Sequence, residues 1–319
     1  MRRREFVIGA SAATVSPAVG QQHRRITILH SGFPNRTPIQ DLYDALRSLG
    51  YESGQTAEIE LLAGEGESDR LASLATRVAQ KQPDVIIALT SPAALALKKA
   101  NVRAPVVFAF VADPIGLGLI DSLARPGGNF TGVTFSEAVL GGKRLDLLRD
   151  AIPGLRKVAV LWSAAFPENG AIAESVAIAG SSVGIEVLSR EIRGSDDLEP
   201  AFEDAAHFPA HAVVFLTDNV LFGQRRRVAE LAVAHRLPSI HAFPPEVRDG
   251  AFLSFGPDIR ESYQRAAALA DRVLRGIAPG DLPVEDPVRF TLAVNVRTAA
   301  ALNLTIPPTL LARADEVIE

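Results

Sequence analysis

Hydroxyl side chains follow an apolar run of the sequence at the point where a helical pattern begins. Thr90 and Ser91 come directly after the run DVIIAL, and Pro92 follows them. A serine or threonine before a proline is typical of a helix start, where free N–H groups attract carboxylates. The pattern therefore predicts a ligand-binding site at this helix start. Two interpretations stay open for Ser91: a helix cap alone, or a cap that also contacts a ligand.

Acidic and aromatic side chains occupy equivalent places after other apolar runs. Asp113 follows VVFAFVA, where its carboxylate either accepts hydrogen bonds from a ligand or serves a turn or hinge. Asp218 follows HAVVFLT and suits a cationic or hydroxyl group. Trp162, the only tryptophan, ends KVAVLW and either stacks on a flat ligand or packs beneath its own loop. The remaining predicted ligand contacts lie in similar loops and are Ser31, Gly32, Gly64, Glu65, Asn169 and Phe243.

The sequence gives little support to catalysis. Cysteine is absent, which excludes disulfides, thiolate metal sites and cysteine nucleophiles. No GxGxxG motif follows a strand pattern, and no phosphate-binding GxxxxGK motif is present. His30 and His241 fall inside expected strands as core or pocket-wall residues, and His207, His211 and His235 show no spacing that indicates a metal site. We therefore expect no enzyme activity, no metal and no cofactor.

The amino-acid composition is typical of a globular protein, and the chain is long enough to form two hydrophobic cores. The 319 residues suit two lobes of about 100 to 150 residues each. The formal net charge of −4 provides no basic surface for nucleic acid. After the N-terminus, no apolar run approaches the roughly 20 residues of a membrane span. We expect a monomer that binds no nucleic acid and does not span a membrane.

The first 22 residues resemble an export signal. Three arginines precede an apolar stretch, and Ala18-Val19-Gly20 resembles a cleavage site. Arg2, Arg3 and Phe6 resemble the twin-arginine signal, which exports folded proteins across a bacterial inner membrane. The predicted location is the periplasm, reached by the twin-arginine route. The alternatives are the general export route and a disordered basic tail.

Apolar runs of strand length alternate with segments of helical period, which is typical of parallel α/β sheets. Segments 39–49 and 69–80 carry apolar side chains at i, i+3, i+4 and i+7, so each predicts a helix with one buried face. The expected strands are 25–30, 57–62, 84–89, 105–110, 130–134, 157–162, 184–188, 211–216, 238–242 and 251–255.

The same pattern occurs twice along the chain. RITILHSG at 25–32 corresponds to KVAVLWSA at 157–164, and PDVIIALTS at 83–91 corresponds to AHAVVFLTD at 210–218. Offsets of about 130 residues with preserved order predict two similar, doubly wound parallel-sheet lobes, with chance similarity as the alternative. Facing carboxyl edges of two such sheets enclose a cleft that hinge motion can close.

The expected lobes are discontinuous in sequence. Lobe 1 contains residues 24–133 and about 257–286, and lobe 2 contains residues 134–256 and about 287–319. Hinge crossings are expected near 130–135, 255–257 and 287–295.

Four segments carry a family resemblance. They are SPAALALKKA from Ser91, DPIGLGLIDSLARPGGNFTGVTF from Asp113, KRLDLLRDAIPGLRKVAVL from Lys143 and LTIPPTLLARADEVIE from Leu304. The chain resembles the ABC transporter substrate-binding proteins, including the tryptophan/tyrosine type, over nearly its whole mature length. The resemblance implies a type I periplasmic-binding-protein fold, a separate permease and ATPase, and no catalysis.

The resemblance and the predicted cleft together give the expected function. The chain would bind a small organic solute, such as an amino acid or an aromatic or carboxylate-like molecule, for an ABC importer. Relatives commonly have an Asn-Pro loop where this chain has Trp162–Asn169, which would change the shape of the pocket. A periplasmic ligand sensor that feeds a membrane receptor is the alternative.

Overall fold

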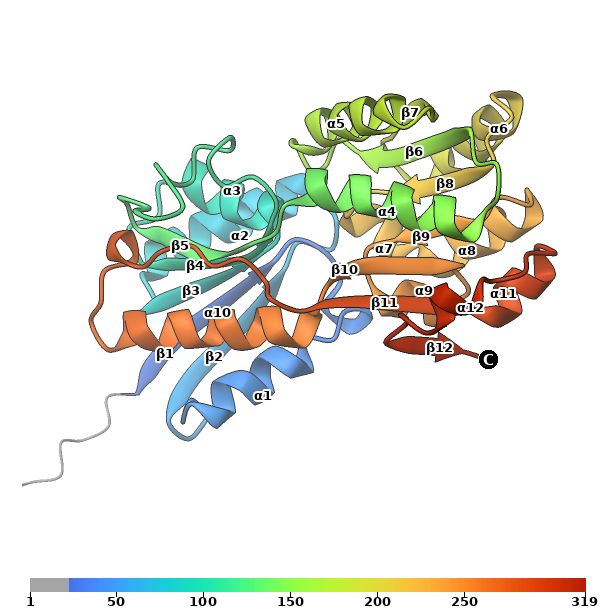
Figure 1. The fold of residues 1–319 in the computed structure, drawn as a ribbon. Coiled ribbons are helices and arrows are strands. Elements are labelled where there is room, and N and C mark those ends of the chain that lie inside the picture. Colours follow the sequence, from blue (N-terminus) through green and yellow to red (C-terminus); the bar gives the residue numbers. More distant parts are fainter. Residues whose placement is uncertain (1–22) are drawn as a thin grey trace, which may run out of the picture.

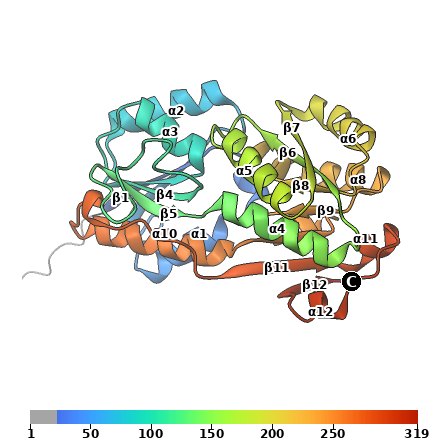
Figure 2. The ribbon, with the colours of Figure 1, turned by 45° about the horizontal axis from the view of Figure 1, so that its top comes forward.

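A computed structural model describes residues 23–319, and Figure 1 shows their fold. The predicted export signal at residues 1–22 lies outside the described residues. Two separate β-sheets lie next to each other, each with helices on both faces (Figures 1 and 2). None of the helices in the described part combines the length and the apolar content that crossing a bilayer requires.

The first sheet has five parallel strands in the order β2-β1-β3-β4-β5. Helices α1 and α10 cover one face, and helices α2 and α3 cover the other. The strands are β1 Arg24–His30, β2 Ala57–Ala63, β3 Val85–Leu89, β4 Val106–Val111 and β5 Phe130–Thr134. The helices are α1 Gln40–Ser48, α2 Ser68–Lys81, α3 Ser91–Lys99 and α10 Ile259–Leu274, with the short turns η1 Pro34–Arg36 and η3 Pro279–Asp281.

The second sheet has seven strands in the order β12-β11-β10-β9-β8-β6-β7, and only the β10–β11 pair is antiparallel. The strands are β6 Lys157–Ser163, β7 Glu186–Ile192, β8 Ala212–Phe215, β9 Ser239–His241, β10 Leu253–Pro257, β11 Phe290–Asn295 and β12 Glu316–Ile318. The helices are α4 Glu137–Ala151, α5 Asn169–Ser182, α6 Leu198–His207, α7 Asn219–Gly223, α8 Arg225–Ala234, α9 Pro244–Arg248, α11 Val296–Ala301 and α12 Pro308–Leu311, with η2 at Ser195–Asp197.

The predicted apolar stripes become the buried helix faces. In α2, Leu71, Ala75 and Val78 pack beneath the helix against β1 and β2. In α1, Leu42 and Leu46 pack against the opposite face of the same sheet. Each buried aliphatic side chain contributes about 1.5 to 3 kcal/mol by leaving water, so these stripes fix each helix on its sheet.

The predicted repeat is confirmed by the order of the strands. The order β7-β6-β8-β9-β10 in the second sheet matches β2-β1-β3-β4-β5 in the first, so both halves are doubly wound. All ten predicted strands are present. Strands β11 and β12 were not predicted, and they extend the second sheet beyond the repeat.

The chain passes between the two sheets three times. It leaves the first sheet after β5 at Thr134 and returns after β10 at Pro257. Helix α10 then packs on the first sheet, and the chain crosses again before β11 begins at Phe290. Short crossings of this kind are the usual elements about which two lobes rotate.

Candidate functional site

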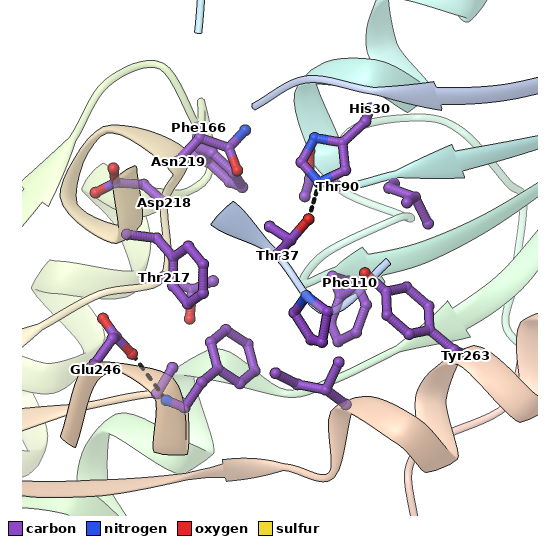
Figure 3. A pocket seen from close by; sticks show the side chains of 16 residues that line it. His30, Thr37, Thr90, Phe110, Phe166, Thr217, Asp218, Asn219, Glu246 and Tyr263 are labelled. Carbon is purple, nitrogen blue, oxygen red and sulfur yellow. Dashed lines mark hydrogen bonds between the residues drawn. The ribbon is translucent and has the colours of Figure 1, made fainter. Parts of the chain in front are cut away.

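A cavity lies between the two sheets, at the carboxyl ends of their strands. It encloses about 590 Å³ of space, part of it open to solvent. The first lobe contributes the ends of β1, β3 and β4 and the start of α10. The second lobe contributes the loops before α7 and α9. Figure 3 shows these side chains around one central space.

Aromatic rings form the apolar wall of the cavity. Phe110 and Phe243 meet edge to face with centroids 6.0 Å apart, although they come from different lobes. Phe110 also contacts Tyr263 at 5.3 Å, and Phe243 contacts Phe222 at 6.1 Å, both edge to face. Edge-to-face contacts hold the rings in fixed orientations. The wall can therefore receive an apolar, flat part of a ligand.

Hydroxyl and amide groups join the two lobes at the polar side of the site. The Ser31 hydroxyl hydrogen bonds both with the Thr90 hydroxyl and with the amide Nδ2 of Asn219, which lies in the other lobe. Gly32 permits this close approach, because a Cβ atom there would lie 2.8 Å from Cγ of Asn219. Ser31 and Thr90 are both buried.

His30 is a neutral wall residue. Burial lowers its pKa to about 4. Its Nδ1 accepts a hydrogen bond from the backbone N–H of Gly32 at 2.8 Å, so the single ring proton must be on Nε2. That nitrogen lies 3.5 Å from the Thr37 hydroxyl. The ring therefore offers a donor and carries no positive charge at neutral pH.

Asp218 lies at the wall of the cavity and caps helix α7. Its Oδ1 accepts a hydrogen bond from the backbone N–H of Leu221 at 2.7 Å. Its Oδ2 is buried and has no hydrogen-bond partner among the described residues. Burial raises the pKa of this carboxyl to about 7. Figure 3 shows the side chain turned toward the helix that it caps.

A second contact between the lobes lies beside the cavity. The Ser91 hydroxyl, at the start of α3, donates a hydrogen bond to Oε1 of Glu168 in the other lobe. Asn169 follows directly, and its Nδ2 donates to the carbonyl of Thr217 at 3.2 Å. Burial raises the pKa of Glu168, while the hydrogen bond from Ser91 opposes that change.

Two residues at the wall have backbone conformations that non-glycine residues rarely adopt. Thr90 has a φ of 84° and Phe110 a φ of 58°. Such conformations cost of order 1 to 3 kcal/mol each and are retained where the surrounding structure imposes them, often at functional sites. Both residues line the cavity, so the unusual backbone shapes the site directly.

The predicted contacts divide into two groups in the structure. Thr90, Asp218 and Phe243 line the cavity, and Asn169 borders a small adjoining space. Ser31, Gly32 and Ser91 lie at the contacts between the lobes. Gly64 lies behind Ser31, whose carbonyl oxygen a Cβ at Gly64 would approach to 3.0 Å.

Three further predicted contacts have other partners. Glu65 forms a surface ion pair with Arg70 at 2.7 Å. Asp113 is exposed and accepts a hydrogen bond from the N–H of Gly116 at 2.7 Å, which stabilises a turn. The indole N–H of Trp162 donates to the Ser189 hydroxyl at 2.9 Å, and its ring packs on Gly170. None of the three is among the residues that line the cavity.

Several lining residues were not predicted as ligand contacts. Phe110 ends a predicted strand, so the rule applied to the other loops would have found it. Phe222 and Tyr263 come from helices, and their approach to the cavity depends on how the lobes pack. No local pattern in the sequence indicates that approach.

One pattern associated with serine nucleophiles occurs away from the cavity. Gly180-Ser181-Ser182-Val183-Gly184 has the spacing GxSxG, but it lies at the end of α5. The Ser182 hydroxyl donates to the carbonyl of Ala179 at 2.7 Å. A nucleophile of this kind requires a sharp turn from strand to helix, so this serine has no such role. The described residues also contain no cluster of three or more side chains suited to a metal.

Comparison with known proteins identifies the family. The family model for ABC transporter substrate binding protein matches residues 30–318. The chain belongs to this family. As an ABC transporter substrate-binding protein it binds solutes and is not an enzyme. Proteins of this kind act outside the cytoplasm, as components of ABC transport systems.

Individual relatives agree with this assignment. The tyrosine-binding protein of Clostridioides difficile strain R20291 is 26% identical over 266 residues, which are 82% of this chain and 74% of the relative. A Streptococcus pneumonia ABC domain solved in complex with L-Trp matches with a TM-score of 0.87 and 23% identity, covering 93% of this chain and all of that one.

A third relative differs more in overall arrangement. It is the ligand-free, open structure of a Clostridium difficile substrate binding protein with adhesive properties. It matches with a TM-score of 0.68 and 22% identity, covering 92% of this chain and 99% of that one. These matches give the chain a periplasmic-binding-protein type I-like fold.

Proposed function

We propose that this substrate-binding protein serves an ABC importer and closes its two lobes around a small amphiphilic molecule, with an aromatic amino acid as the first candidate. The observation that carries this proposal is the cavity itself. Its lining comes from both lobes, with aromatic rings on one side and hydroxyl and amide groups on another. A ligand there touches both lobes at once and stabilises their closed arrangement.

The ligand class is supported by the chemistry of the wall. Phe110, Phe222 and Phe243 provide flat apolar surface for a ring. Thr90 and Asn219 provide hydroxyl and amide groups for the polar part of the ligand. The names of the tyrosine-binding and L-Trp-bound relatives agree with this choice.

Two observations support the proposal that the lobes are in a closed arrangement in this structure. Hydrogen bonds already join the lobes at Ser31–Asn219 and Ser91–Glu168. The TM-score falls from 0.87 against the L-Trp complex to 0.68 against the open, ligand-free relative, while the identities are nearly equal at 23% and 22%. Different lobe angles would produce such a difference.

The remaining parts of the proposal concern boundaries and location. We assign lobe 1 to residues 24–133 and about 257–286, and lobe 2 to residues 134–256 and about 287–319. These limits agree with the crossings at Thr134, Pro257 and Phe290. Residues 1–22 would direct the chain to the periplasm by the twin-arginine route, where it would act as a monomer with a membrane permease and its ATPase.

Binding is tested on the chain from residue 23 onward by thermal shift and titration calorimetry. The panel contains L-tryptophan, L-tyrosine, L-phenylalanine, aliphatic amino acids, aromatic acids and nucleosides. A ligand at 100 times its Kd should stabilise the folded chain by about 2.7 kcal/mol and raise its melting temperature. A panel in which no compound shifts the melting temperature would refute the proposed ligand class.

Closure is tested with two fluorophores, one on each lobe. The sequence has no cysteine, so Asp69→Cys on α2 and Glu174→Cys on α5 give two unique labelling sites on exposed positions. Energy transfer should rise when the ligand saturates the protein. Unchanged transfer at saturation would contradict closure while leaving binding itself intact.

A further inference from the structure

Tyr263 carries a hydroxyl group that makes no hydrogen bond with the described residues of the protein. Its side chain is 3% exposed and lines the cavity. Tyr51, by comparison, donates its hydroxyl proton to Asp271 at 2.8 Å. The hydroxyl of Tyr263 has no such partner among the described residues. A ligand that fills the cavity would displace water from this hydroxyl, so the ligand itself must then supply the hydrogen-bond partner.

The hydroxyl of Tyr263 is directed at the space where a ligand would lie. Figure 3 shows the ring extending from α10 toward the middle of the cavity. The ring is held by an edge-to-face contact with Phe110, with an interplanar angle of 85°. Burial raises the pKa of the phenol, so it stays neutral and can both donate and accept a hydrogen bond.

Neighbouring polar side chains on the wall already have hydrogen-bond partners within the protein. Thr37 donates to the carbonyl of Pro34 at 3.2 Å and lies near His30. Glu246 accepts hydrogen bonds from the N–H of Phe243 at 2.9 Å and lies 3.0 Å from the ring of His241. Tyr263 is therefore the polar group available among the rings of the apolar wall.

We propose that Tyr263 determines specificity by hydrogen bonding with a polar atom on the ring of the ligand. The site then selects an aromatic ligand that carries a ring hydroxyl or ring N–H over the same ligand without that atom. An unsubstituted ring would bury the Tyr263 hydroxyl beside carbon, and a site that leaves a polar group unpaired rejects such a ligand. This inference rests on the proposed function for the presence of an aromatic ligand.

Matched ligand pairs test the inference. L-tyrosine is compared with L-phenylalanine, and L-tryptophan with 3-benzothienyl-L-alanine, in which sulfur replaces the ring N–H. Calorimetry with the unmodified protein should show tighter binding of the polar member of at least one pair, by roughly 10-fold. The Tyr263→Phe variant should lose that preference by weakening the polar member, while the other member binds as before.

Two controls separate hydrogen bonding from packing. Tyr263→Phe keeps the ring that contacts Phe110, so its melting temperature without ligand should match the unmodified protein. Tyr43→Phe removes a hydroxyl from a half-buried tyrosine on α1 outside the cavity lining and should keep the full preference. A preference that survives in Tyr263→Phe, or an equal weakening of both members, would overturn the inference.

The proposed function and this inference fail in different ways. If the unmodified protein binds both members of each pair equally well, the role of Tyr263 is refuted and the proposed function stands. If it binds none of the four compounds, the inference is refuted, and the proposed function is refuted with it only if the wider panel of the thermal-shift test also contains no ligand.

Discussion

The Ser91 hydroxyl donates a hydrogen bond to the carboxylate of Glu168 across the boundary between the two lobes, and both side chains are buried there. In the proposed opening of the lobes, Glu168 would gain water. When they meet, Ser91 replaces part of that water. The pair therefore favours the closed arrangement only while the hydroxyl is present.

Ser91→Ala should weaken ligand binding, because the closed form would then bury Glu168 without this donor. A lost hydrogen bond to a charged group predicts a Kd raised by roughly 10-fold, measured by calorimetry at pH 7.5. Ser175→Ala is the control, since its hydroxyl donates to Ala171 within α5 at 3.0 Å and touches no other lobe. Equal effects of the two substitutions would show that the contact between the lobes is unimportant.

Gly32→Ala should also weaken binding, through steric hindrance. The new Cβ would lie 2.8 Å from Cγ of Asn219, so the lobes could not approach as closely. We expect reduced energy transfer between lobe labels at saturation, with an unchanged melting temperature of the ligand-free protein. Gly142→Ala serves for comparison, because its Cβ would meet only Ala179 at an ordinary 3.8 Å. Normal closure in Gly32→Ala would contradict the prediction.

Arg144→Met should strongly destabilise the second lobe. The guanidinium group is fully buried, contacts Glu137 at 2.6 Å and donates to the carbonyl of Phe255 at 2.8 Å. Removing it leaves a buried carboxylate without its partner, which costs about 3 to 5 kcal/mol. Urea unfolding measures the loss.

The double variant Glu137→Gln/Arg144→Met provides the control for this ion pair. It removes both charges, so it should be more stable than Arg144→Met alone. A double variant that is less stable than Arg144→Met would contradict the explanation that the unpaired carboxylate of Glu137 causes the loss of stability.

Asp218 should make the stability of the ligand-free protein depend on pH. Its pKa is about 7 in the folded chain and near 3.8 when unfolded, so the folded state binds the proton more tightly. The resulting stability is present below pH 3.8 and is lost as the pH rises through 7. Asp218→Asn removes this titration, so the variant should lose less unfolding free energy than the unmodified protein between pH 5 and pH 8.

The matched control for the pH prediction is Asp113→Asn. Asp113 also accepts a backbone hydrogen bond, from Gly116, but it is exposed. Its variant should keep the pH dependence of the unmodified protein. If the free energy of unfolding changes with pH in the same way in the unmodified protein and in Asp218→Asn, the titration assigned to Asp218 is contradicted.

The repeated fold could be predicted because its signals are local. Each apolar run and each helical stripe is contiguous, and the two halves preserve the same order. Strands β11 and β12 were missed because they lie outside the repeat. β12 has only three residues, and β11 begins with an exposed phenylalanine at Phe290.

The site could be predicted only in part. The end of a strand shows where a residue lies, but it does not show which way the side chain points. Thr90 and Trp162 both lie at such ends, yet one lines the cavity and the other packs near β7 through Ser189. Tyr263 reaches the cavity from the start of α10, after the chain has returned to the first lobe. That approach depends on two crossings of the chain between the lobes that lie far apart in the sequence. No short sequence pattern can therefore predict it.

The contact between Phe110 and Phe243 has a consequence for energy use by the transport system. Because these rings come from different lobes and contact each other directly, part of the free energy of the proposed closure would belong to the protein itself. In the proposed transport cycle, this contact would favour the closed shape in empty molecules as well as in loaded ones. A permease that recognises this shape would meet unloaded carriers, and each productive encounter with one would hydrolyse ATP without moving cargo. In the proposed transport system, a stronger contact between these rings would therefore make loaded and empty carriers harder for the permease to distinguish.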